Sequence, residues 1–172
     1  HIKLVRVSVF PQCYAAVADR IRSLPKRAVI VDIGSWTIDI MPTYQYYPNE
    51  SECTTTPQGL IRCMREMNEE CVRRIGQELD EDLIQEIMVG GKANLPEVYQ
   101  EIVEESLRKF TEKVYHMLKE HGYNLDITPI VFVGGGATVM KRFGKPMGGN
   151  VQYFQDIKAN AKGYEYLGRA YL

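Results

Sequence analysis

The chain has 172 residues, of which 45% are hydrophobic and 25% are charged, and its formal net charge is −1. This composition describes an ordinary globular domain with room for two subdomains, and it excludes a disordered or collagen-like chain. A net charge near zero gives no sign of nucleic-acid or membrane binding, so we expect no direct contact with either.

The four cysteines form no pattern typical of a metal site or a disulfide framework. They include no Cys-x-x-Cys pair and have no histidine at ligand spacing; they are Cys13, Cys53, Cys63 and Cys71. Reduced packing residues are the simplest interpretation, which favours a cytoplasmic protein. No apolar run is long enough to span a bilayer, and the first residues show no signal-peptide pattern.

The N-terminal residues predict a strand followed by a helix. Residues 2–10 alternate roughly between apolar and polar side chains and predict a strand that ends at Pro11. Residues 12–24 carry apolar side chains at helical spacing and predict a helix that stops before Pro25. A turn at this proline leads into the next strand.

A strand, a tight polar loop and a second strand are predicted for residues 29–41. The polar or conformationally special residues of this segment are Asp32, Gly34, Ser35, Trp36, Thr37 and Asp39. Amide groups at the glycine tip can point at an anion, and a carboxylate at the strand end can hold a hydrated divalent cation. An ordinary hairpin with polar tips explains these residues equally well.

Residues 43–56 predict a hairpin at the edge of the sheet, with a turn at residues 48–50. Thr56 and Pro57 then predict a helix start, with the threonine as N-cap. Apolar side chains recur at three- and four-residue intervals over residues 60–75, so one face of this helix should be buried. Its charged face is interpreted as a solvated surface.

Two further helices and a buried strand are predicted in the middle of the chain. Residues 80–89 favour a short helix that ends at a glycine pair, and Asn94 is the predicted N-cap of a long helix over residues 95–121. The apolar run of residues 129–133 predicts a strand, and this helix-to-strand order is typical of an α/β layer.

Three glycines, Gly134, Gly135 and Gly136, follow that strand directly. They are costly in chain entropy, so they indicate that something flat or charged lies against bare backbone. A flexible strand-to-helix turn is the simpler alternative. The remaining predicted elements are a helix over 137–143, a loop over 145–150, a strand over 151–154 and a helix over 159–172.

The two loops together resemble those of the actin-like ATPase superfamily. Asp-Ile-Gly-Ser-Trp-Thr-Ile-Asp at residues 32–39 is similar to its second phosphate loop, and Val-Gly-Gly-Gly-Ala at residues 133–137 is similar to its adenosine loop. Within this superfamily the chain looks most like the ParM/StbA group of bacterial plasmid-segregation proteins. The segments that suggest this group are Val-Phe-Pro-Gln at 9–12, Thr-Pro-Gln-Gly at 56–59 and Asn-Ala-Lys-Gly-Tyr at 160–164.

The resemblance implies an α/β fold, namely the ribonuclease H-like mixed sheet with flanking helices of an actin-like ATPase lobe, plus a small mainly helical subdomain. Family members have two lobes, with the nucleotide in the cleft between them. No Asp-x-Gly loop precedes residue 29, so we expect this chain, which begins with His1, to be the second lobe. The implied parts are the lobe junction at 1–28, the core subdomain at 29–56 and 122–172, and the helical subdomain at 57–121.

The resemblance also implies a site for ATP or ADP with Mg²⁺. Asp32 would hold the magnesium ion through water, and the amides of Gly34 and Ser35 would contact the β- and γ-phosphates. Thr37 and Asp39 would brace the loop. Such electrostatic placement is most of what phosphoryl transfer requires from a protein.

Other implied site residues lie outside this loop. Residues 134–136 would carry the adenosine, and Glu70 and Arg74 are weaker candidates for contacts to it. Gln12 stands where relatives have a glutamate linked to hydrolysis; an amide cannot act as a general base, although it can orient a water. For Trp36 we favour packing at the lobe interface over stacking on a ligand.

The expected function is that of the nucleotide-binding lobe of an actin-like, filament-forming protein of the DNA-segregation type, with itself and a DNA-bound adaptor protein as partners. The complete protein would be an ATPase, whereas the isolated chain should hydrolyse ATP poorly or not at all. One alternative is a non-catalytic interaction domain that keeps the fold, which Gln12, Ser35 and Trp36 favour. Another is a chaperone- or kinase-like member of the same superfamily.

Overall fold

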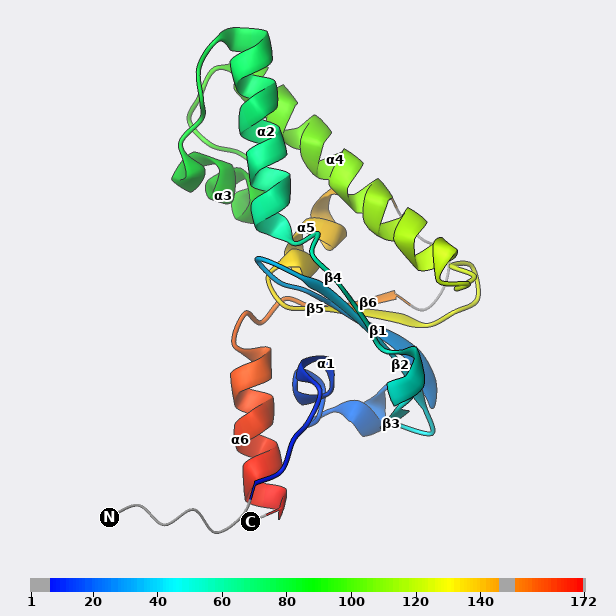
Figure 1. Ribbon diagram of the computed structural model, residues 1–172. Coiled ribbons are helices and arrows are strands. Elements are labelled where there is room, and N and C mark those ends of the chain that lie inside the picture. The colour runs from blue at the N-terminus through cyan, green and yellow to red at the C-terminus, as the bar shows by residue number, and fades with distance from the viewer. Residues whose placement is uncertain (1–6, 146–150, 172) are drawn as a thin grey trace, which may run out of the picture.

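The computed structural model describes residues 7–145 and 151–171. Within them the chain forms a mixed sheet with helices packed on both faces, as Figure 1 shows. The strands are β1 (Arg27–Ile33), β2 (Ile38–Tyr44), β3 (Tyr47–Pro48), β4 (Thr54–Thr56), β5 (Ile130–Val133) and β6 (Val151–Phe154). The helices are α1 (Gln12–Ala15), α2 (Leu60–Ile75), α3 (Glu81–Gly90), α4 (Glu97–Glu120), α5 (Gly136–Phe143) and α6 (Ala159–Tyr171), with short 3₁₀ helices η1 (Ile21–Ser23) and η2 (Glu50–Glu52). The predicted α/β class is confirmed.

The sheet brings the two predicted loops together. Its strand order is β3-β2-β1-β5-β6, and β4 also pairs with β2. β1 is antiparallel to β2 and parallel to β5. In this register Asp32 lies opposite Asp39 on β2 and beside Val133 on β5. The carboxyl ends of β1 and β5 therefore meet at one edge of the sheet, where α/β proteins commonly bind ligands.

Alternate residues of β1 pack on opposite faces of the sheet. Val29 and Val31 belong to a core cluster with residues of α2, α3, α4 and α5. Ala28 and Ile30 belong to a second cluster with residues around α1. Figure 1 shows the same division, with α2 to α5 on one side and α1 and α6 on the other. Because side chains alternate along a strand, Asp32 faces the α1 and α6 side.

The N-terminal predictions are largely wrong. The helix predicted over residues 12–24 ends at Ala15, and residues 16–24 form turns and η1. Their apolar side chains are buried by the sheet and by α6, so tertiary packing and not helical periodicity explains the pattern. Residues 7–10 form no strand. The rest of that predicted strand, residues 2–6, lies outside the described residues.

The start of α2 also differs from the prediction. Thr56 is not an N-cap, because it pairs with Ile38 in β4. The helix begins at Leu60, and Gly59 occupies the N-cap position. Because β4 extends the sheet as far as Thr56, residues 57–59 are needed to turn the chain toward the helix.

The hairpin at the sheet edge is confirmed, but its turn lies elsewhere. The turn residues are Gln45 and Tyr46, with φ of 52° and 73°. Two-residue hairpin turns of this kind require positive φ because it matches the twist of the paired strands. The predicted turn at residues 48–50 instead connects β3 to η2.

The long helix α4 begins two residues later than predicted, at Glu97. Pro96 occupies the N-cap position, so Asn94 does not cap the helix. The fixed φ of proline prepares the chain for the first helical turn. The side-chain amide of Gln100 reaches back and donates to the carbonyl of Gly91 at 2.7 Å, which ties the preceding loop to α4.

The other predicted elements are confirmed with small changes in their bounds, namely α3, β5, α5, β6 and α6. The predicted loop over residues 145–150 lies outside the described residues except for Lys145. None of the described helices is both long and apolar enough to cross a membrane. The cysteines are free thiols, of which Cys13, Cys63 and Cys71 are buried and Cys53 is exposed.

Candidate functional site

Asp32 lies at the centre of the candidate site. It stands at the end of β1 and is 2% exposed. The Nδ2 of Asn160, in the first turn of α6, donates a hydrogen bond of 2.8 Å to Asp32 Oδ2. The backbone of Gly134 lies against the other oxygen, since a Cβ on this glycine would stand 2.5 Å from Oδ1, and its φ is +78°. A side chain at Gly134 would therefore displace the carboxylate.

The turn after β1 is held by the start of α2. The carbonyl groups of Gly34, Ser35 and Trp36 accept hydrogen bonds of 2.9–3.1 Å from the amides of residues 59–61. The amides that a helix leaves without an intrahelical partner are thus satisfied by the turn. The amides of residues 35–37 donate to no other described residue, so they are available to an anion.

A second carboxylate, Asp39, braces this turn from β2. It accepts hydrogen bonds from the hydroxyl groups of Thr37 at 3.1 Å and Thr55 at 2.5 Å. The sequence patterns indicated Thr37 and Asp39 but missed Thr55, which lies on β4 and reaches the site because β4 pairs with β2.

The glycine run after β5 lies beside the end of β1. A Cβ on Gly136 would meet Ile33 Cγ2 at 2.1 Å, so Gly136 is packed tightly against β1. The outer side of Gly135 is open, because the nearest atom to a Cβ there would be Ile157 Cγ2 at 4.0 Å. Ile157 is 78% exposed beside it. An open glycine next to an exposed apolar side chain can hold the flat face of a ligand, and sequence patterns had not indicated Ile157.

Gln12 reaches the same carboxylate from the first turn of α1. Burial raises the pKa of Asp32, and the charge of Asp39 raises it further. Hydrogen bonds from the side chains of Asn160 and Gln12 lower this pKa, because they favour the ionised form. The structure therefore brings Gln12, Asp32 and Asp39 together.

We expect Asp32→Asn to raise the thermal unfolding midpoint near neutral pH in the presence of EDTA. The folded protein binds the carboxyl proton more tightly than the unfolded chain, so ionisation of Asp32 destabilises the fold. This cost is absent below the unfolded pKa of about 3.9 and develops as the pH rises to the higher folded pKa. Calorimetric midpoints should therefore diverge between variant and parent from about pH 3 to about pH 7. A constant difference over that range would contradict this account.

Glu70 and Arg74 are not brought into this group. Both lie in the second half of α2, about 15 and 21 Å along the axis from its first residue. Glu70 forms an ion pair with Arg73, and Arg74 forms one with Glu105 on α4. The first pair lies along α2, and the second joins α2 to α4.

Trp36 projects from the turn and is 66% exposed. The guanidinium group of Arg65 lies over its ring, 6.0 Å from the centroid. Packing of Trp36 at the interface between two lobes stays a prediction.

The polar atoms around Asp32 fit a hydrated magnesium ion. Among the described residues, no three His, Cys, Asp or Glu side chains gather to form a metal site. Magnesium needs no such group, since it keeps several waters and binds through one or two carboxylates and substrate phosphates. Asp32 offers the carboxylate, and the Oδ1 of Asn160 is buried without a hydrogen-bond partner in the described structure. An all-oxygen set of this kind suits magnesium.

Residues 30–144 match the family model described as archaeal actin homologue MreB-like, C-terminal. The chain belongs to this MreB-like family. The matched region of the MreB-like chain begins within β1 and extends past α5, so it includes both loops and the helices between them. No curated protein sequence matches the chain.

Solved structures show the same fold. Ta0583, an archaeal actin homologue, has a TM-score of 0.67 at 20% identity, over 95% of this MreB-like chain and 56% of its own. A Bacillus thuringiensis ParM hybrid protein with ADP has a TM-score of 0.64 at 14% identity, over 92% and 27% of the two chains. MreB 5 of Spiroplasma citri bound to AMPPNP has a TM-score of 0.62 at 12% identity, over 92% and 58%. The expected actin-like fold is confirmed, and the MreB-like chain spans little more than half the length of Ta0583.

Proposed function

We propose that this MreB-like chain is the nucleotide-binding lobe of an actin-like filament protein. Three features that meet at one edge of the sheet carry the proposal: buried Asp32, the open face of Gly135, and the amides of residues 35–37, which donate to no other described residue. They offer a carboxylate for a cation, donors for phosphate and bare backbone for a flat ring. ADP or AMPPNP is present in solved structures of Ta0583 and of MreB 5.

In this proposal ATP or ADP binds with Mg²⁺, and Asp32 holds the ion through water. The amide of Gly34 already donates to the carbonyl of Thr37 at 3.0 Å, so we assign the phosphate contacts to residues 35–37. Thr37 and Asp39 hold that turn in shape. When bound, the magnesium ion neutralises phosphate charge and orients the nucleotide.

Residues 134–136 carry the adenosine in this proposal, with Ile157 as an apolar wall. Glu70 and Arg74 have no role in it, because their ion pairs lie away from the glycine run. Gln12 orients a water for hydrolysis and cannot take its proton. We therefore propose ATPase activity for a two-lobed protein and little or none for this chain alone.

Titration of Mg-ATP and Mg-ADP into the chain, followed by calorimetry, tests the nucleotide site. Gly135→Val should weaken binding by about tenfold or more, since its side chain occupies the open face and one lost polar contact alone is worth that factor. Gly90→Val is the matched control, because a Cβ there meets nothing within 4 Å and the valine has similar room. Absence of binding to the parent chain, or equal binding by both variants, would contradict the proposal.

Two exposed charge clusters of opposite sign support head-to-tail self-association. The basic cluster near the β2–β3 hairpin consists of Arg22, Lys26 and Arg27, and the acidic cluster at the start of α3 consists of Glu78, Asp80, Glu81, Asp82 and Glu86. Within the described residues none of the eight forms an ion pair. Figure 1 shows β3 and α3 at opposite ends of the molecule. Complementary ends of one chain make heterologous contacts, which build open filaments.

We expect Arg22→Glu with Arg27→Glu to abolish assembly in Mg-ATP, as measured by sedimentation velocity, because like charges then meet at the contact. Glu81→Lys with Asp82→Lys should have the same effect. Mixing the two double variants should restore assembly, since the native ends pair with each other and the changed ends also carry opposite charges. A chain that carries all four changes should assemble again. Assembly of the double variants at the parent's level would refute this contact. Assembly of the parent that is not weakened by about 0.5 M salt would refute it as well.

We further propose that the complete protein acts in the cytoplasm in DNA segregation of the ParM/StbA type, through a DNA-bound adaptor protein. The segments at residues 9–12, 56–59 and 160–164, which resemble those of the ParM/StbA group, support this assignment. The alternative is a non-catalytic interaction domain, which Gln12, Ser35 and Trp36 favour because all three depart from the residues that the family resemblance implies at these positions. Lack of nucleotide binding by a chain that contains both lobes would favour the alternative.

A further inference from the structure

Asn160 has one hydrogen-bonded and one orphaned polar atom beside Asp32. Its Nδ2 donates to Asp32 Oδ2 at 2.8 Å, whereas its Oδ1 is buried and has no hydrogen-bond partner within the described structure. Proteins rarely leave a buried acceptor unsatisfied, because its lost hydration costs free energy. The orphaned oxygen therefore indicates a donor that joins the site with a ligand.

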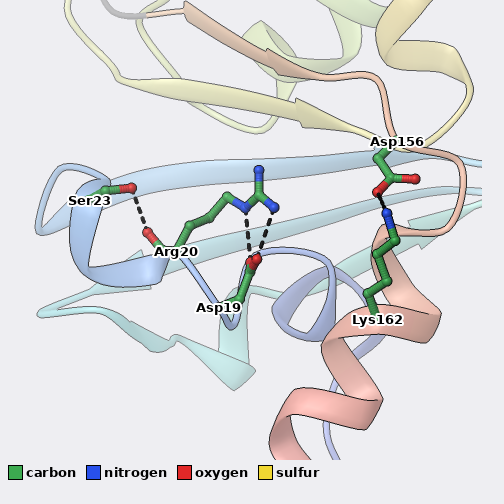
Figure 2. A network of polar contacts seen from close by, with 5 residues as sticks. All are labelled: Asp19, Arg20, Ser23, Asp156 and Lys162. Atoms are coloured by element: carbon green, nitrogen blue, oxygen red, sulfur yellow. Dashed lines mark hydrogen bonds and ion pairs between the residues drawn. The ribbon is translucent and has the colours of Figure 1, made fainter.

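The first turn of α6 holds this side chain in place. Asp156 accepts hydrogen bonds from the backbone amide of Lys158 at 2.9 Å and from the Nζ of Lys162 at 2.5 Å. Figure 2 shows Lys162 reaching from the helix to Asp156. One turn further on, Gly163 packs directly against the backbone of Ala15 on α1. Because α6 is fixed at both points, the Asn160 amide is preorganised and does not have to be ordered on binding.

The chemistry of the orphaned atom selects its partner. An amide oxygen only accepts hydrogen bonds. A water bound to a divalent cation turns its lone pair toward the metal and its hydrogens outward, so it is a donor toward other groups. A second carboxylate at this position would add negative charge next to Asp32 and Asp39, whereas an amide supplies an acceptor without that repulsion.

We propose that Asn160 is a positioning residue of the cation site: its Nδ2 holds Asp32 in one orientation, and its Oδ1 accepts a hydrogen bond from a water of the divalent cation that enters with the nucleotide. The inference rests on the proposed nucleotide site and adds a residue to it. It predicts that Asn160 contributes to the gain in affinity that magnesium brings, and not to binding of the nucleotide itself.

The test is calorimetric titration of ADP in the presence of Mg²⁺ and, separately, of EDTA, into the parent chain, Asn160→Ala and Tyr164→Phe. Tyr164→Phe is the matched control, because it removes a hydrogen bond from the same helix, the 3.1 Å bond from the hydroxyl to the carbonyl of Phe10, without touching Asp32. Circular dichroism checks that each variant is folded.

In Asn160→Ala, the gain in ADP affinity that magnesium brings should be about tenfold smaller than in the parent. The affinity for ADP in EDTA should match that of the parent. Tyr164→Phe should keep both values. An unchanged magnesium gain in Asn160→Ala, or equal losses with and without magnesium, would overturn the inference and leave the nucleotide site intact. Failure of the parent to bind ADP under either condition would overturn the proposed function and this inference with it.

Discussion

Gly163→Ala is expected to lower the free energy of unfolding by about 2–3 kcal/mol, the largest effect of any small substitution that we expect on stability. A Cβ at this position would lie 1.6 Å from the carbonyl oxygen of Ala15. That neighbour is backbone, so no side-chain rotation relieves the overlap, and α6 must move away from α1. The displacement also opens the cluster of Ala15, Ala18 and Leu167. Alanine gains about 1 kcal/mol of helix propensity over glycine, which offsets only part of this cost.

Urea unfolding at equilibrium measures this effect, with Gly90→Ala as the matched control. Gly90 also lies in a helix, as the last residue of α3. A Cβ there meets nothing within 4 Å, and its φ is not positive. The control should be neutral or more stable by up to about 1 kcal/mol. Equal midpoints for the two variants would show that α6 does not pack against α1 as closely as the structure has it.

Gly59→Ala is expected to weaken Mg-ADP binding by about tenfold or more, with a smaller loss of stability. Its Cβ would lie 2.5 Å from the carbonyl carbon of Trp36 and 2.6 Å from the carbonyl oxygen of Ser35. The turn must shift to make room, and its hydrogen bonds to the first amides of α2 lengthen. In the proposed site this turn presents the phosphate-binding amides, so the shift removes at least one hydrogen bond to a charged group.

The fluorescence of Trp36 can report the shift of the turn, because Trp36 is the only tryptophan of the chain and stands on the turn itself. The emission of Trp36 should change in the Gly59→Ala variant before any nucleotide is added. Gln58→Ala is the control, since Gln58 is exposed and directly precedes the glycine. If Gly59→Ala had the same nucleotide affinity and the same Trp36 emission as the parent, the start of α2 would not set the shape of the turn.

Local patterns in the sequence were sufficient to predict the two loops. The apolar runs that end at Asp32 and at Val133 are short-range features, and a run of glycines directly after a buried strand indicates close approach to the backbone. The α/β class, the helix α3, and the strands β5 and β6 followed from the same kind of signal. Patterns failed where burial came from distant elements. Residues 16–24 resemble a helix because the sheet and α6 bury them, and Thr56 resembles a cap although β2 draws it into a strand.

The sequence by itself therefore determined which residues carry charge and bare backbone at the sheet edge, namely Asp32, Asp39 and the run at 134–136. Only the tertiary structure decided which other residues join them to form the site. Asn160 lies 128 residues from Asp32 along the chain, and Thr55 and Gly59 reach the first turn through strand pairing and the position of α2. No local periodicity records such contacts, because they exist only once the sheet has formed and α2 and α6 have packed on its two faces.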